Sequence, residues 1–263
     1  MKKLTTLLLL SGCFALSFSQ DYSKFQKKIY ALGSDTLAYR ILFPENYDST
    51  KQYPLVVFLH GAGQRGKDNQ KQLLNGASLF LREANRKQFP TIVIFPQCSL
   101  NDFWARTRII NTSKDSTPFK FEYLTDVPMN KGLNLVSHLL DSLATAKNIN
   151  AKQIYIGGLS MGGMGTFELL WRKPDFFAGA FPICGGGNPS TVSLYGKGFP
   201  IWVFHGDKDP VVDVNDSRKM VEALKAVEAD VKYTEYAGVK HDSWKKAFQE
   251  PKLLAWLFSQ KKE

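Results

Sequence analysis

A series of short, continuous apolar runs is the feature that most constrains the fold of this chain. The runs are mostly continuous and do not alternate between polar and apolar residues as a strand with one face in water does. This pattern is typical of strands buried on both faces of a sheet. Six such runs occupy residues 55–59, 91–95, 153–156, 178–182, 201–204 and 231–236. Two earlier β-type runs, at 29–32 and 37–43, bring the expected number of strands to eight.

Helical patterns lie between the later runs. Apolar residues recur at helical spacing in two sets, which are Leu133, Val136, Leu139, Leu140 and Leu143, and Met220, Val221, Leu224 and Val227. This spacing places each set on one face of a helix. Two early strands followed by strand–helix alternation predict an α/β sandwich with a mostly parallel sheet. The sequence contains no internal repeat, low-complexity tract or linker, so a single domain is expected.

The composition fits one globular domain with a large core, because 44% of the 263 residues are hydrophobic and 13% are aromatic. The formal net charge of +10 comes from lysines and arginines that are spread along the chain. No arginine-rich arm, zinc ligand set or RNA-binding motif accompanies them. The charge therefore indicates a solvated basic surface, and no nucleic-acid partner is expected.

The first residues have the pattern of a secretory signal. Three residues, Met-Lys-Lys, give a positive start, and the segment Leu4–Phe18 is apolar apart from small hydroxyl residues, one glycine and one cysteine. Fifteen residues are too few for a bilayer span, so a cleaved signal peptide over residues 1–19 is predicted rather than a transmembrane anchor. The domain would then comprise residues 20–263.

Two cleavage sites compete in this segment. The letters LSGC at 10–13 match a lipobox, which would leave a lipid anchor on Cys13, whereas SFSQ permits ordinary cleavage after Ser19. Because the apolar run continues beyond Cys13, ordinary cleavage and a periplasmic or secreted protein are favoured. An oxidising compartment would allow Cys98 and Cys184 to form one disulfide, and the sequence leaves open whether they pair.

The segment IYIGGLSMGGMGTFELL at 154–170 carries the strongest chemical motif. It reads as a strand, then G-x-S-x-G, then a helix. Small flanking residues allow a turn from strand to helix that exposes Ser160 at the helix N-terminus, where the helix dipole favours negative charge. Ser160 is the predicted nucleophile. The alternative is that Ser160 only caps the helix.

A serine nucleophile needs a histidine base, and the chain has four histidines. His138 lies inside a leucine-rich helical stripe, which predicts a partly buried structural role. His60 and His205 each end a strand in a His-Gly pair and are expected to organise a turn. His241, in YAGVKHDSW, follows the last strand and precedes the last helix, and it is the predicted base.

The acid is expected after the strand at 201–204. Asp207, Asp209 and Asp213 all follow this strand. The order Ser160, Asp209, His241 is the chain order of α/β hydrolases, and the His-Gly-x-x-Asp spacing favours Asp209. Asp207 is expected to brace the turn, and Asp213 is expected to begin the next helix.

The stretch LHGAGQRGKDN at 59–69 contains G-x-G-x-x-G, which is also the pattern of a dinucleotide-binding turn. A dinucleotide site would need an acidic residue at the end of the next strand, but that strand ends in IFP at 94–96. In a serine hydrolase the same loop supplies an oxyanion-hole N–H. The predicted donors are the backbone N–H groups of Ala62 and Met161.

Together these motifs resemble the exported esterase and predicted-peptidase branch of the α/β-hydrolase superfamily. The likeness covers about residues 25–259 and includes PQC…W, PICGGGN, HGDKDPVV and KHDSW. This branch is similar to dienelactone hydrolases, feruloyl and acetyl esterases, and the catalytic domain of prolyl oligopeptidases. The resemblance implies a three-layer sandwich with a mostly parallel eight-stranded sheet, a triad of Ser160, Asp209 and His241, and oxyanion donors at Ala62 and Met161. The HGAG loop departs from the HGGG of lipase-like families, so lipid substrates are not implied.

The sequence therefore predicts an exported serine carboxylesterase that uses neither a metal nor an organic cofactor. Its expected substrates are small-molecule or carbohydrate esters, among them acyl and hydroxycinnamoyl esters of sugars. A serine peptidase is the first alternative, because the triad does not reveal the leaving group. A non-catalytic surface-binding protein on the same scaffold is the second, although it would have no need of a complete triad.

The connection at 99–127 has almost no periodicity, and a loop of this length is usually functional or disordered. It contains Trp104, Arg106 and Arg108, which would form an apolar wall with cationic groups if they faced the substrate. Trp244, three residues after His241, would form the opposite wall. The competing interpretation is that Trp104 is a buried anchor of the loop.

Overall fold

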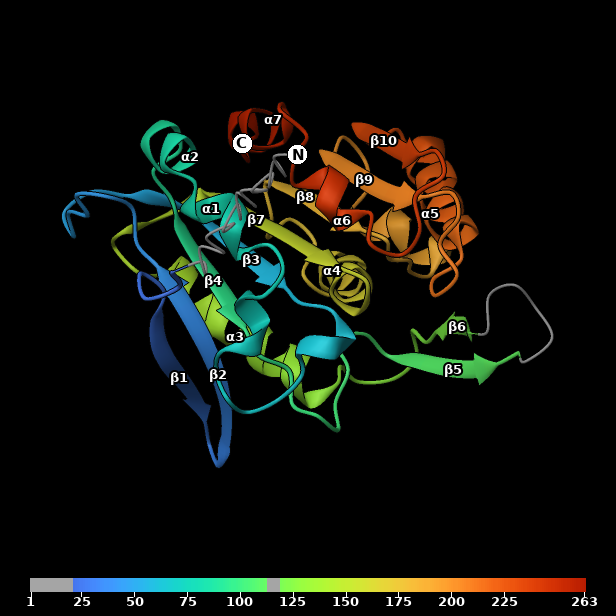
Figure 1. Cartoon of the computed structure of the whole chain (residues 1–263), viewed down its shortest axis with the longest axis horizontal. Helices are drawn as coiled ribbons and strands as arrows, with labels where there is room; N and C mark the ends of the chain where they lie inside the picture. Colours follow the sequence, from blue (N-terminus) through green and yellow to red (C-terminus); the bar gives the residue numbers. More distant parts are fainter. Residues whose placement is uncertain (1–20, 113–118) are drawn as a thin grey trace, which may run out of the picture.

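The computed structural model describes residues 21–112 and 119–263, and Figure 1 shows the chain. The predicted signal peptide at 1–19, the alternative lipid-anchor site at Cys13 and the predicted new terminus at Gln20 lie outside the described residues. Within the described part of the chain, no helix is long and apolar enough to cross a membrane.

A mostly parallel sheet of eight strands organises the described residues, with the strand order β1-β2-β4-β3-β7-β8-β9-β10. All eight predicted runs are strands of this sheet, so the predicted fold class is confirmed. The strands are β1 (Gln26–Leu32), β2 (Asp35–Leu42), β3 (Tyr53–Leu59), β4 (Ile92–Pro96), β7 (Ile149–Leu159), β8 (Gly179–Ile183), β9 (Ile201–Gly206) and β10 (Val231–Tyr236).

Parallel pairing joins six of these strands, from β4 through β3, β7, β8 and β9 to β10. Only β2 runs against its neighbours, because it pairs antiparallel with both β1 and β4. The carboxyl ends of β3, β7, β8, β9 and β10 therefore meet at one edge of the sheet. Loops that leave this edge are close together in space although they are far apart in sequence.

Helices cover both faces of the sheet, and successive strand residues point to opposite faces. On one face, Leu55 and Val57 pack in a cluster with α3 (Lys131–Ala144), α4 (Met161–Arg172) and α5 (Val214–Ala226). On the other face, Val56 and Phe58 pack with α1 (Ala77–Leu81), α6 (Trp244–Ala247) and α7 (Leu253–Ser259). This gives the three predicted layers. The remaining short helices are α2 (Glu83–Gln88), η1 (Ala62–Gln64), η2 (Lys71–Leu73) and η3 (Pro189–Leu194).

The prediction that residues 99–127 form an irregular connection is wrong for part of this segment. Strands β5 (Thr107–Asn111) and β6 (Phe119–Tyr123) form an antiparallel hairpin that extends away from the main sheet (Figure 1). Apolar side chains such as Ile109 and Phe119 are exposed on it. Neither strand has the continuous apolar run of a strand buried on both faces. Apolar and polar residues do alternate in β6, where Phe121 and Tyr123 pack against the small cluster of Ala105, Met164 and Val212.

Trp104 lies before this hairpin and is completely buried. Its indole N–H donates a hydrogen bond of 3.0 Å to the carbonyl oxygen of His60, and its side chain packs closely against Gly165 of α4. A side chain with no exposed surface cannot present a face to a substrate. The predicted substrate-binding role of Trp104 is therefore corrected, and the structure supports the anchor interpretation.

The two cysteines of the described chain are both buried and free, so Cys98 and Cys184 do not pair with each other. Burial raises the pKa of the Cys98 thiol, and the nearby carboxylate of Asp102 raises it further. Both thiols are packed within the two main hydrophobic clusters, where they behave as small apolar side chains.

We expect Trp104→Ala to lower the free energy of unfolding by about 3–5 kcal/mol, because it leaves a large cavity in the core. Trp104→Phe keeps most of the volume but leaves the His60 carbonyl without its donor, which is expected to cost about 1–3 kcal/mol. Chemical denaturation of the two variants beside the wild type measures both losses. A loss of less than about 1 kcal/mol for Trp104→Ala would contradict the anchor role.

Candidate active site

The turn between β7 and α4 holds Ser160 in a strained backbone conformation, with φ 54° and ψ −119°. Its N–H donates to the carbonyl oxygen of Ile183 at 2.9 Å, which ties the turn to β8. The main chains are so close here that a Cβ at Gly162 would overlap the carbonyl oxygen of Leu59. A Cβ at Gly158 would overlap the carbonyl oxygen of Gly162. The glycines of the motif are therefore required by close backbone packing.

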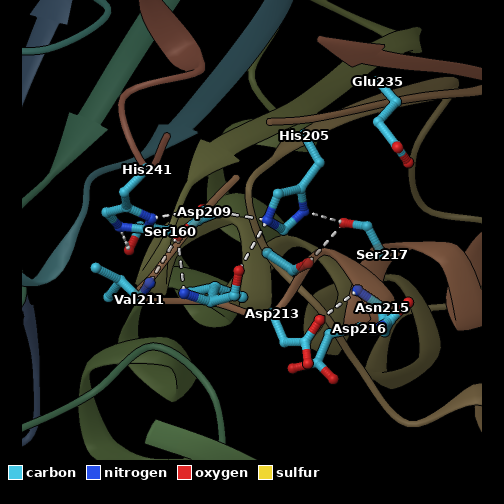
Figure 2. Close-up of polar contacts among 12 residues, drawn as sticks. Ser160, His205, Asp209, Val211, Asp213, Asn215, Asp216, Ser217, Glu235 and His241 are labelled. Carbon is cyan, nitrogen blue, oxygen red and sulfur yellow. Dashed lines mark hydrogen bonds and ion pairs between the residues drawn. The ribbon is translucent and has the colours of Figure 1, made fainter. Parts of the chain in front are cut away.

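Three side chains predicted to act together are joined by hydrogen bonds (Figure 2). The Oγ of Ser160 lies 2.9 Å from Nε2 of His241, and Nδ1 of His241 lies 2.7 Å from Oδ2 of Asp209. A carboxylate only accepts, so Nδ1 carries a proton in this arrangement and the neutral ring accepts from the Ser160 hydroxyl. The structure thus brings Ser160, His241 and Asp209 together in the order that proton transfer from serine requires.

Asp209 is a buried carboxylate in the loop after β9. Its Oδ1 accepts hydrogen bonds from the backbone N–H groups of Val211 and Val212, at 2.8 and 3.0 Å. Its Oδ2 accepts from His241 and also faces Nε2 of His205, at 3.2 Å. Burial by itself would raise the pKa of Asp209, but hydrogen bonds from His205 and His241 outweigh it and hold the pKa below the usual range. Asp209 is therefore ionised at neutral pH.

The other two aspartates of this loop do what their positions predict. Asp207 accepts a hydrogen bond of 2.6 Å from the N–H of Gly238, which braces the loop after β10. Asp213 is the N-cap of α5 and accepts from the N–H of Asn215 at 2.9 Å. Neither carboxylate is hydrogen-bonded to His241 among the contacts of the described residues. The geometry distinguishes Asp209 from both.

The loop after β3 is organised by the buried imidazole of His60. Its Nδ1 lies 2.7 Å from the carbonyl oxygen of Gly61, and its Nε2 accepts from the N–H of Cys98 at 3.0 Å. Burial lowers the pKa of His60 to about 4, so the ring is neutral with its proton on Nδ1. In a trans peptide the C=O and N–H groups point in opposite directions. By holding the Gly61 carbonyl, His60 therefore also fixes the direction of the Ala62 N–H.

The two predicted oxyanion donors have no acceptor within the described residues. Met161 is the first residue of α4, so its N–H has no partner inside the helix. Ala62 begins the short helix η1, and none of the hydrogen bonds of the described chain uses its N–H. Both N–H groups are free to donate to an oxygen atom of a substrate.

The remaining predicted binding residues are placed differently from one another. Trp244 is half-buried and packs edge-on against the ring of His241, with centroids 5.4 Å apart. The guanidinium of Arg106 donates to Asn130, and that of Arg108 pairs with a glutamate on the exposed hairpin. Among the interactions of the described residues, only that of Trp244 connects a predicted substrate-wall residue to the Ser160–His241 pair.

Sequence reasoning missed the contact between His205 and Asp209, and it assigned His205 only to the turn. The clue in the sequence was the His-Gly-x-x-Asp spacing, which places the histidine at the end of the strand and the acid in the loop that follows.

His138 also differs from its prediction. It is exposed on α3 instead of partly buried, because other residues, such as Leu135 and Leu139, form the buried face of that helix.

A group of three side chains has ligand atoms close enough to be considered for a metal. In the described chain these are Cys184, Asp209 and His241, whose ligand atoms lie within 4.8 Å of one another. A metal there would have to displace the hydrogen bond between His241 and Asp209. Burial also raises the pKa of the Cys184 thiol, and the nearby Asp209 carboxylate adds to this. The donor set therefore favours hydrogen bonding over metal binding.

Comparison with known proteins supplies relatives of this architecture. The chain is 33% identical over 88 residues to a bifunctional acetylxylan esterase/xylanase of Neocallimastix patriciarum, which covers 34% of this chain and 13% of that protein. The crystal structure of a thermostable esterase superimposes with a TM-score of 0.78 at 35% identity, covering 91% of this chain and 64% of that one. The chain therefore spans less than two thirds of either relative.

A third structure shows the fold alone, because its sequence identity is only 16%. It is a ferulic acid esterase from Anaeromyces mucronatus in complex with ferulic acid, and it superimposes with a TM-score of 0.63 over 92% of this chain and 93% of that one. Residues 119–253, just over half of the chain and including the Ser160 turn, Asp209 and His241, match the phospholipase/carboxylesterase family. The chain belongs to the phospholipase/carboxylesterase family and has its α/β-hydrolase fold.

Proposed function

We propose that this protein is a serine hydrolase that cleaves carboxylic esters by way of an acyl-enzyme. The observation that carries the proposal is the chain of two hydrogen bonds from Ser160 through His241 to Asp209, at 2.9 and 2.7 Å. Membership of the phospholipase/carboxylesterase family supports the reaction class. Similarity to an acetylxylan esterase supports ester over amide substrates.

In the proposed mechanism, Oγ of Ser160 attacks the ester carbonyl while Nε2 of His241 takes the hydroxyl proton. Asp209 holds the ring with Nδ1 protonated and stabilises the imidazolium that forms. The carbonyl oxygen becomes negative and accepts hydrogen bonds from the N–H groups of Ala62 and Met161. His241 then returns its proton to the leaving alcohol. Water, activated by His241 in the same way, cleaves the acyl-enzyme and restores Ser160.

For the substrate, we propose small-molecule or carbohydrate esters, including acyl and hydroxycinnamoyl esters of sugars. The half-buried indole of Trp244 beside His241 supports an acyl group with a planar or apolar surface. The relative from Neocallimastix patriciarum supports a carbohydrate alcohol on the other side of the ester bond. The reaction as proposed needs no metal and no organic cofactor.

The wild-type protein is expected to hydrolyse short aryl esters, and Ser160→Ala is expected to lower kcat/KM by about 10⁴-fold or more. Alanine fits the turn because it is smaller than serine, so the variant should fold. Measuring release of the aryl alcohol and thermal unfolding in parallel tests both statements. Ser193→Ala, which changes an exposed serine of η3, is the matched control and should retain wild-type activity.

Aminoacyl anilides separate esterase from peptidase activity in the same assay. Faster turnover of anilides than of esters would contradict the proposed reaction class. No turnover of either substrate class by the folded wild type would instead favour a binding protein on this scaffold. Residual activity of a few per cent in Ser160→Ala, with contamination excluded, would move the nucleophile to another residue.

Asp209→Asn is expected to lower kcat by about 10⁴-fold, because an amide can donate to Nδ1 and so hold His241 in the wrong tautomer. Asp207→Asn should leave kcat within about threefold of wild type, as expected for a surface substitution, because the amide oxygen still accepts from Gly238. Steady-state kinetics on one aryl ester compares the two variants directly. If the larger loss occurred at Asp207, the assignment of the acid would be wrong.

We further propose that the protein is exported and that the mature chain begins at Gln20, as a single hydrolase domain. The sequence supports this with a basic start and an apolar segment that ends in SFS before Gln20, where Ser17 and Ser19 are the small residues. The intact mass of the protein recovered from its native host is expected to match residues 20–263. A mass that corresponds to a diacylated terminus at Cys13 would contradict ordinary cleavage.

A further inference from the structure

The carboxylate of Asp209 is shared by two histidines. Its Oδ2 accepts from Nδ1 of His241 at 2.7 Å and lies 3.2 Å from Nε2 of His205 (Figure 2). The proposed mechanism uses His241 alone. His205 is completely buried at the end of β9, on the side of Asp209 away from Ser160.

The surroundings of His205 require a proton on its Nε2 atom. Nε2 faces two acceptors, Oδ2 of Asp209 and the carbonyl oxygen of Val212 at 3.1 Å. It must therefore be an N–H donor. On the other side of the ring, Nδ1 lies 2.7 Å from Oγ of Ser217, which is itself 2.7 Å from the carbonyl oxygen of Gly185. The Ser217 hydroxyl donates its single proton to Gly185, and its oxygen atom together with the Val212 carbonyl holds the ring in the orientation that directs Nε2–H at Asp209.

We propose that His205 is a positioning residue that shares the negative charge of Asp209 and limits how strongly Asp209 favours the protonated form of His241. Each donor to a carboxylate oxygen withdraws charge that the other donors would otherwise receive. His241 must be unprotonated to accept the proton of Ser160. Because His205 weakens the stabilisation of protonated His241 by Asp209, His241 stays unprotonated, and able to act as a base, at lower pH. This inference rests on the proposed roles of Asp209 and His241.

Other ionisable groups also face this network. Cys184 lies beside Asp209, Asp216 and Glu235 interact electrostatically with His205, and Asp242 interacts with His241. Several of these groups have partners of their own, which are Tyr123 for Asp216, Arg218 for Glu235 and Lys245 for Asp242. A comparison of two variants that differ only at position 205 leaves all of these groups in place.

Asparagine and glutamine at position 205 form a matched pair. The amide of His205→Asn falls near Nδ1, where it meets Ser217 but does not reach Asp209. The amide of His205→Gln extends to the position of Nε2 and still donates to Oδ2. In His205→Asn, the acid limb of the kcat/KM profile is expected to move to higher pH by about 0.5–1 unit, less than the 1–3 units that a full neighbouring charge produces. His205→Gln should stay within about 0.2 unit of wild type, because it keeps the donor.

An NMR titration of the His241 ring in the Ser160→Ala background measures the same shift without any turnover. The midpoint of that titration is expected to rise in His205→Asn and to stay unchanged in His205→Gln. This readout separates a failure of the inference from a failure of the proposed esterase function. Should His205→Asn not accumulate as folded protein, His205→Phe fills the same volume without a donor and carries the same expectation.

Three results would overturn the proposal. An unchanged His241 midpoint in a folded donor-less variant would mean that His205 does not influence the base. An equal shift in the asparagine and glutamine variants would mean that the donor at the Nε2 position is not the cause. A shift of the His241 midpoint to lower pH in the donor-less variant would mean that His205 strengthens the interaction of Asp209 with His241 instead of weakening it.

Discussion

The site depends on one close contact between two main chains, that of Leu59 at the end of β3 with Gly162 in the first turn of α4. No side chain fits between them, since a Cβ on Gly162 would overlap the Leu59 carbonyl. This contact brings the loop that carries the Ala62 N–H beside the helix start that carries Ser160 and Met161. Ser160, the proposed nucleophile, and the N–H groups of Ala62 and Met161, the proposed oxyanion donors, are therefore placed by backbone packing.

The second requirement is a buried negative charge, and the structure meets it with donors of two kinds. Backbone N–H groups of Val211 and Val212 occupy one oxygen of Asp209, and imidazoles occupy the other. Backbone donors do not titrate, so they hold the carboxylate in place at every pH. The second oxygen joins the rings of His205 and His241, so the orientations of both rings depend on the same carboxylate.

Features that depend on burial or on local backbone geometry could be predicted from the sequence, and features that depend on tertiary contact could not. The six parallel strands of the sheet and the turn at Ser160 have mostly continuous apolar runs or required glycines. The strands β5 and β6 have neither, because most of their side chains are exposed. For an aromatic residue such as Trp104, the residue type alone does not distinguish a core position from a position in the wall of a substrate site. His205 lies four residues from Asp209, but only the fold directs its ring back onto the acid.

The neutral imidazole of His60 has a consequence for how this protein responds to acid. Because burial lowers its pKa to about 4, His60 keeps the same donor and the same acceptor at any pH above about 5. Its bonds to Gly61 and Cys98 therefore persist through the range in which an ordinary histidine gains a proton. Acidification to this point therefore leaves the hydrogen bonds of the loop after β3 unchanged, and with them the direction of the Ala62 N–H, the proposed oxyanion donor.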